Sequence, residues 1–144
     1  MSQRFFPDTM PQPLADATTL PWWEAVAEHR LLVQACADCG ATRLPPAPVC
    51  PECRSHEAGW LEISGRGTVY TYTTVHRPIA ANQTLPFVIA VIALEDAGGV
   101  RLISNLVGIE PDAVEVGLPV EVVWEDMSSE LSVPRFRQRL ESGQ

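Results

Sequence analysis

Two C-x-x-C pairs, CADC at 36–39 and CPEC at 50–53, are the strongest constraint on how this 144-residue chain can fold. Each pair can wrap a tight turn whose two sulfurs point inward, and two such turns complete a tetrahedral shell of four sulfurs. The chain has four cysteines in all, so none is left over. We therefore predict one metal site, formed by Cys36, Cys39, Cys50 and Cys53.

The chemistry of the four ligands narrows the choice of metal. Thiolates are soft donors, which favours zinc and leaves a single iron ion as the second choice. A closed shell of four thiolates has no open coordination position, so we expect a structural metal. Two disulfides would need an oxidising compartment, and the opening MSQRFFPDTMPQPL lacks the apolar stretch of a signal peptide. A thioredoxin-like redox dithiol is the other alternative, but neither pair lies in a βαβ pattern.

Charge and hydropathy bear on partners and location. The formal net charge is −8, and all ten basic residues are arginines. An acidic chain without a basic stripe is poorly suited to the phosphate contacts that dominate nucleic-acid binding. No apolar run approaches the roughly 20 residues of a membrane-spanning helix. We therefore expect a cytoplasmic protein that does not enter the membrane, with nucleic acid a disfavoured partner.

The N-terminal third predicts an arm, a helix and a small ribbon. Residues 1–18 show no periodicity and are expected to form a flexible arm. A helix is predicted to begin at Thr19 as its cap, with Pro21 in the first turn. Short strands before and after the first cysteine pair complete a rubredoxin-like zinc ribbon, which together with the helix covers 19–58.

From residue 59 onward the sequence alternates short β-type runs with turn residues. Asp96 to Gly99 is typical of a hairpin turn. Five antiparallel strands in so short a span favour a small closed barrel of the OB type, followed by a C-terminal tail, over 59–144. The predicted strands are 60–64, 67–77, 86–94, 99–107 and 118–125. The predicted fold is thus mainly β: an N-terminal helix, a rubredoxin-like zinc ribbon, then a five-stranded OB-fold barrel.

The order of helix, ribbon and barrel resembles the acyl-CoA-associated zinc-ribbon/OB-fold family of bacteria and archaea. The resemblance covers about residues 20 to 138. It implies an accessory protein of a thiolase-like or other acyl-CoA-processing enzyme, which holds the acyl-CoA or completes the site of its partner. The segments that carry it are PWWEAVAEHRLLVQACADCG, PPAPVCPEC, SGRGTVYTYTTVHRP, LPFVIAVIALEDAGGVRLISNLVG, GLPVEVVWE and VPRFR.

The residues themselves offer no catalytic constellation. His76 has no acid adjacent to it in sequence, and the chain lacks a glycine-rich phosphate loop. We therefore predict a chain that is not itself an enzyme, although it can form part of an enzyme complex, and we name no catalytic residue. The remaining alternatives are a single-stranded nucleic-acid module of the OB type and a rubredoxin-like iron electron carrier.

Two groups of residues are candidates for binding. Arginines near strand ends can grip the phosphates of coenzyme A, and tyrosines on one strand face can stack on its base. The alternatives are surface salt bridges for the arginines and core packing for the tyrosines. The candidates for ligand binding are Arg66, Arg77, Arg101, Tyr70 and Tyr72. The candidates for partner binding are Trp22, Trp23, Arg135, Phe136 and Arg137, with packing on the protein's own core as the alternative for the tryptophans.

Overall fold

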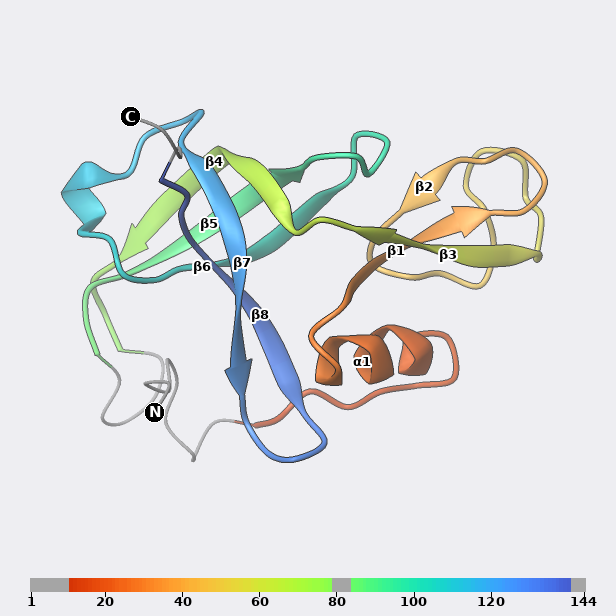
Figure 1. Ribbon diagram of the computed structural model, residues 1–144, viewed down its shortest axis with the longest axis horizontal. Helices are drawn as coiled ribbons and strands as arrows, with labels where there is room; N and C mark the ends of the chain where they lie inside the picture. Colours follow the sequence, from red (N-terminus) through yellow and green to blue (C-terminus); the bar gives the residue numbers. More distant parts are fainter. Residues whose placement is uncertain (1–10, 79–83, 141–144) are drawn as a thin grey trace.

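The structure is a computed structural model that describes residues 11–78 and 84–140 (Figure 1). A three-stranded ribbon sheet, ordered β2-β1-β3, lies beside a closed five-stranded barrel, ordered β4-β5-β6-β8-β7. This confirms the predicted fold class. The elements are α1 (Leu20–Ala27), β1 (Leu31–Cys36), β2 (Thr42–Arg43), β3 (Ala58–Ile63), β4 (Arg66–Val75), β5 (Phe87–Leu94), β6 (Arg101–Leu106), the 3₁₀ helix η1 (Pro111–Ala113), β7 (Pro119–Asp126) and β8 (Ser132–Gln138).

Helix α1 forms where the sequence predicts it, but its cap is different. Thr19, the predicted cap, already has near-helical backbone angles (φ −95°, ψ −14°) and makes no side-chain capping bond. Asp16 takes that role instead, because its Oδ1 accepts a hydrogen bond of 2.8 Å from the Thr19 N–H. The helix buries Trp22, Ala25 and Val26 toward the rest of the protein.

The first strand of the predicted barrel is wrong, because β3 belongs to the ribbon. The stretch predicted as barrel strand 60–64 belongs to the ribbon, where it pairs antiparallel with β1 from Leu31↔Ile63 to Cys36↔Ala58. The chain leaves the second cysteine turn close to β1, so the backbone groups of β3 find their partners there before they reach the barrel. Pairing β3 with β1 carries the ribbon sheet from the metal site to the barrel (Figure 1).

The predicted barrel also lacks its last strand, which is β8. Residues 132–138, predicted to lie in the C-terminal tail, pair with β7 from Val120↔Gln138 to Asp126↔Ser132 and complete the barrel. The stretch reads SVPRFRQ, in which a proline and two arginines hide a strand pattern. Phe136 is fully buried at its centre, opposite Val122. The side chains of this stretch therefore alternate as in a strand. Its two arginines, Arg135 and Arg137, form ion pairs with acidic residues of β7.

A single apolar core joins the helix, the ribbon and the barrel. It includes Val26 of α1, Val33 of β1, Ile92 of β5 and Phe136 of β8, all with no exposed surface. A hydrogen bond of 2.7 Å from the Thr42 hydroxyl to the Ala97 carbonyl also ties β2 to the β5–β6 turn. The two parts therefore fold onto each other. Within the described residues, no helix is long and apolar enough to cross a membrane.

Candidate metal centre and barrel pockets

The four cysteines converge at the tip of the ribbon. Their sulfurs lie within 4.8 Å of one another, with 3.5 Å between Cys36 and Cys53 and 3.7 Å between Cys39 and Cys50. Zinc–sulfur bonds of about 2.3 Å in a tetrahedron place sulfurs about 3.8 Å apart, whereas a disulfide needs about 2.05 Å. The cluster therefore fits a tetrahedral four-thiolate site and contains no disulfide.

Backbone N–H groups at the two turns favour the thiolate form of one cysteine in each pair, whereas burial and the neighbouring thiolates raise the pKa of Cys39 and of Cys53. The N–H of Cys39 lowers the pKa of the Cys36 thiol to about 6, and the N–H of Cys53 likewise lowers the pKa of Cys50. Gly40 follows the first turn at φ +79°, a conformation that suits glycine. Both turns thus present their inner sulfurs as ligands, and the donor set suits zinc.

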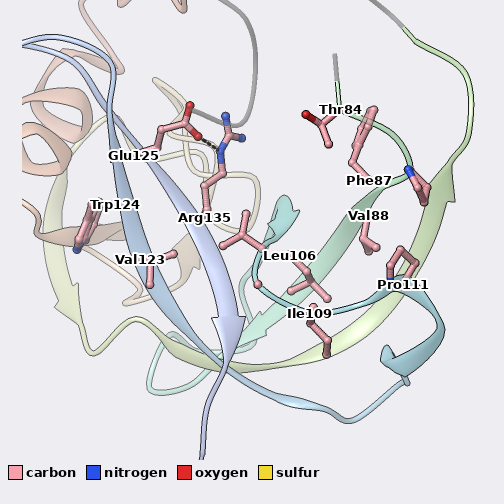
Figure 2. A pocket seen from close by; sticks show the side chains of 13 residues that line it. Thr84, Phe87, Val88, Leu106, Ile109, Pro111, Val123, Trp124, Glu125 and Arg135 are labelled. Atoms are coloured by element: carbon pink, nitrogen blue, oxygen red, sulfur yellow. Dashed lines mark hydrogen bonds and ion pairs between the residues drawn. The ribbon is translucent and has the colours of Figure 1, made fainter. Parts of the chain in front are cut away.

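A pocket of about 410 Å³ opens at one end of the barrel, away from the metal. Figure 2 shows β7 and β8 residues on one side of it and residues of β5 and of the segment after β6 on the other. The wall is mostly apolar, with one ion pair exposed to the cavity. We call this the mouth pocket; it is lined by Thr84, Pro86, Phe87, Val88, Leu106, Val107, Gly108, Ile109, Pro111, Val123, Trp124, Glu125 and Arg135.

A second pocket, of about 320 Å³, lies between α1 and the outside of the barrel. We call it the side pocket. The Trp22 and Trp23 rings meet edge to face at its helical side, with centroids 4.8 Å apart. It is lined by Trp22, Trp23, Phe87, Ile89, Leu102, Ile103, Ser104, Asn105, Val133, Pro134 and Arg135.

A buried polar network stands between the two pockets. Arg135 Nε donates to Glu125 Oε2 at 3.0 Å, and Arg135 Nη1 donates to Asn105 Oδ1 at 2.8 Å. Only 10% of the arginine side chain and 5% of the glutamate side chain are exposed. Asn105 Nδ2 in turn donates to the Val88 carbonyl at 3.0 Å. At this depth the attraction between the two charges offsets the cost of removing them from water, because little water is available to solvate either ion.

The predicted ligand-binding arginines do not come together. Arg66 opens β4 and lies beside the β5–β6 turn, where its carbonyl accepts from the Glu95 N–H, and Arg101 opens β6 at the same end of the barrel. Arg77 follows the other end of β4. There Val75 pairs with Phe87 of the mouth pocket. Of the three, Arg77 alone lies at the pocket end.

The two predicted tyrosines do not share a face. The register between β4 and β5 shifts after Val69, which makes Tyr70 the extra residue of a β-bulge. Tyr70 lies under the guanidinium of Arg101, 3.9 Å from its ring centroid. Tyr72 pairs with Ala90, which puts it on the other face of β4, where its side chain is 38% exposed. The bulge therefore breaks the predicted stacking pair, because the extra residue reverses the alternation.

The predicted partner-binding residues are also divided. Phe136 has no exposed surface, so this prediction is corrected: the side chain forms core. Trp22 is 7% exposed, and its Nε1 donates to the Leu32 carbonyl at 2.9 Å. Arg137 pairs with Glu121 at 3.4 Å on the surface. Trp23 remains half-buried beside the side pocket.

Sequence reasoning missed the Arg135 network and both pockets. Glu125 falls at the end of the predicted strand 118–125 and was not among the candidate residues, yet it is only 4% exposed. The signal that could have found this network is the spacing of the charges: Arg135 and Arg137 alternate in one stretch, and Glu121 and Glu125 lie in the strand before it. Once β8 is placed antiparallel to β7, Arg137 pairs with Glu121, and Arg135 lies diagonally across from Glu125.

Comparison with known proteins agrees with this architecture. Residues 23–57 match the family model described as "ChsH2, rubredoxin-like zinc ribbon domain", and residues 60–125 match "ChsH2, C-terminal OB-fold domain". A solved structure titled "Ltp2-ChsH2(DUF35) aldolase" superposes with a TM-score of 0.81 at 39% identity, covering 88% of this chain and 98% of that one.

Three curated relatives point the same way. A "Probable enoyl-CoA hydratase alpha subunit" of Thermomonospora curvata is 40% identical over 88% of this chain, and a "3-oxo-4,17-pregnadiene-20-carboxyl-CoA hydratase alpha subunit" of Mycobacterium tuberculosis is 38% identical over 83%. The chain spans about two fifths of the length of these two relatives. A "DUF35 domain-containing scaffold protein" of Methanocaldococcus jannaschii is 35% identical over 77% of this chain and 79% of its own length.

These names correct one prediction. The sequence predicted a chain that is not an enzyme, but two of these relatives are named as hydratase subunits and the solved structure as an aldolase. The absence of a recognisable catalytic constellation in one sequence does not exclude a part in an enzyme, because a site can be completed across subunits. With the zinc ribbon, the OB barrel and the scaffold relative taken together, this chain belongs to the DUF35 family, which includes ChsH2.

Proposed function

We propose that the chain is a zinc-stabilised subunit of an acyl-CoA-processing enzyme, and that it assembles with a thiolase-like or hydratase-type partner. The likeness that carries this proposal is the superposition, at TM-score 0.81 and 39% identity, on nearly the whole of a chain from an aldolase structure. The relatives named as enoyl-CoA and pregnadiene-carboxyl-CoA hydratase subunits support an acyl-CoA substrate. The mouth pocket supports it as well, because it is apolar with one buried ion pair, as a site for an acyl or pantetheine arm would be.

We propose zinc as the metal of the four-cysteine site, with a structural role. When bound, the ion would cross-link the two turns through Cys36, Cys39, Cys50 and Cys53, whose sulfur spacings fit its tetrahedral geometry. The alternative occupant, iron, would colour the protein red. Elemental analysis that finds one zinc per chain in a colourless protein would support zinc, and a red protein with stoichiometric iron would refute it.

Arg77 is the residue we propose for the phosphates of coenzyme A at the mouth pocket. It is exposed, and it follows Val75, whose strand partner Phe87 lines that pocket. A guanidinium at a pocket entrance can bind a phosphate in bidentate fashion. Arg101 is a matched control, since it is also exposed but lies at the far end of the barrel against Tyr70.

The assembly is tested by co-expression with thiolase-like and hydratase-type enzymes encoded beside its gene. We expect one of them to elute with the chain at defined stoichiometry, and its turnover of acyl-CoA to fall at least tenfold without the chain. In the assembled complex, R77A should raise KM for acyl-CoA several-fold, while R101A should leave it unchanged. If no such enzyme assembles with the zinc-loaded chain or depends on it, the proposed function is wrong.

A further inference from the structure

The mouth pocket and the side pocket meet at two shared residues. Phe87 and Arg135 line both cavities, one from the start of β5 and the other from the middle of β8. Arg135 also bonds to one residue from each side, because Glu125 lines the mouth pocket and Asn105 lines the side pocket. The pockets are therefore neighbours across one partition.

The character of the lining residues changes from the mouth pocket, across the partition, to the side pocket. The mouth pocket combines apolar walls with Glu125 and lies at the barrel end where Arg77 follows β4. The partition carries the fixed positive charge of Arg135. The side pocket beyond it presents large apolar side chains, among them Trp23 and Ile103. A ligand lying across all three would need a polar middle, an apolar end and an end that reaches phosphate.

We propose that the two pockets form one elongated site for an acyl-phosphopantetheine thioester. The acyl chain lies in the side pocket, the thioester carbonyl lies against the Arg135 guanidinium, and the pantetheine arm lies in the mouth pocket. The choice of a thioester rests on the proposed function; the division into two compartments rests on the shared partition. Each cavity alone is within the size range of small-molecule sites, at about 410 and 320 Å³.

The position of the Arg135 network explains why a carbonyl would stop there. Glu125 and Asn105 fix the guanidinium from two sides, so it cannot swing away to solvent. A carbonyl oxygen beside a held cation is stabilised, whereas a plain methylene chain at the same place gains nothing from the charge. The partition would thus set the register of the ligand, with the length of its acyl chain measured from Arg135 into the side pocket.

Calorimetry on the zinc-loaded full chain, with free CoA, butyryl-CoA and octanoyl-CoA, tests this site. Each methylene buried in the side pocket should tighten binding by up to about fourfold. We therefore expect octanoyl-CoA to bind at least about tenfold tighter than butyryl-CoA. I103D, at a side-pocket residue 70% exposed, should remove that preference and leave butyryl-CoA binding unchanged. V116D is the matched control, because Val116 is 67% exposed and lines neither pocket. This substitution should leave the affinity for both acyl-CoAs unchanged.

A further arm separates the two sources of such a thioester. Octanoyl-pantetheine that binds as tightly as octanoyl-CoA would support the site and favour an acyl-carrier-protein donor, because the nucleotide would contribute nothing. Weaker binding of octanoyl-pantetheine would support the site with CoA as the donor.

The elongated site would be overturned by equal affinity for butyryl-CoA and octanoyl-CoA, or by equal effects of I103D and V116D on octanoyl-CoA binding. No binding of any acyl-CoA would also overturn it, even if the chain still assembles with its enzyme, in which case the proposed subunit role survives. Conversely, binding with the expected chain-length dependence but no assembly would leave the site standing and refute the subunit role.

Discussion

Replacing Arg135 with methionine should cost far more stability than the same change two residues later, at Arg137. Arg135 and Glu125 are 3.0 Å apart with side chains 10% and 5% exposed, whereas Arg137 and Glu121 are 3.4 Å apart and 58% and 36% exposed. R135M removes the cation of a buried ion pair, which costs about 3–5 kcal/mol. R137M removes a screened surface pair that contributes about 0–1 kcal/mol.

Urea denaturation in excess zinc, followed by circular dichroism, measures the difference. With a slope of about 2 kcal/mol per molar urea, R135M should lower the unfolding midpoint by about 1.5–2.5 M and R137M by less than about 0.5 M. The double variant R135M/E125L should recover about half of the loss. The remaining cost is about 1–3 kcal/mol for the Asn105 Oδ1 atom, whose bond of 2.8 Å to the guanidinium is gone.

The comparison can refute the reasoning in two ways. Similar midpoints for R135M and R137M would mean that water reaches Glu125 and that the pair is not buried in solution. A double variant less stable than R135M alone would mean that the carboxylate of Glu125 stabilises the fold even when Arg135 is absent. Either result would also remove the fixed cation on which the register of the proposed thioester depends.

Three more perturbations have definite outcomes. C39S should abolish stoichiometric zinc and disorder the ribbon while most barrel β signal persists; complete loss of that signal in circular dichroism would contradict this. G67A should lower stability by about 1–3 kcal/mol in urea, because its methyl carbon would lie 2.5 Å from a carbonyl oxygen of β5. The Ser132 hydroxyl and His29 hold the pKa of Asp126 below its usual value. The ionised Asp126 carboxylate therefore stabilises the folded state above about pH 4, and this stabilisation is lost as the pH falls further. D126N should therefore be less stable than wild type near pH 6, by less than about 1 kcal/mol at this half-exposed site, with the gap closing below pH 4.

How far the sequence predicts this protein depends on how local each signal is. The cysteine spacing predicts the four-sulfur cluster because two short turns determine it, and the hairpin at Asp96 forms as expected, with φ +58° there. The pairing of β3 and the existence of β8 depend on which distant strand is adjacent, which local alternation does not encode. The bulge at Tyr70 is a further case, because one extra residue reverses the two faces of a strand and is invisible without its partner.

The residues of the proposed site were hidden for the same reason. Arg135 and Glu125 are ten positions apart with a turn between them, and each alone reads as a surface charge. They become a buried pair only after β7 and β8 are in register, because the pairs Val123↔Arg135 and Glu125↔Val133 are two residues apart along the ladder and leave Arg135 diagonal to Glu125. Asn105 joins them from β6, thirty positions away. A polar network assembled from three separate strands therefore cannot be recognised in the sequence until the pairing of those strands is known.

The metal and the side pocket are linked through one strand. Cys36 ends β1, and four residues earlier the Leu32 carbonyl accepts the indole N–H of Trp22, which lines the side pocket. Leu31 and Val33 on the same strand are buried in the core that the ribbon shares with the barrel. A cross-link at the tip of the ribbon thus restrains the register of β1, and β1 restrains α1. The structural metal would then act on ligand binding without touching the ligand, by holding the helical wall of the pocket in place. On this reasoning, zinc removal should weaken binding of long acyl chains before it weakens binding of short ones.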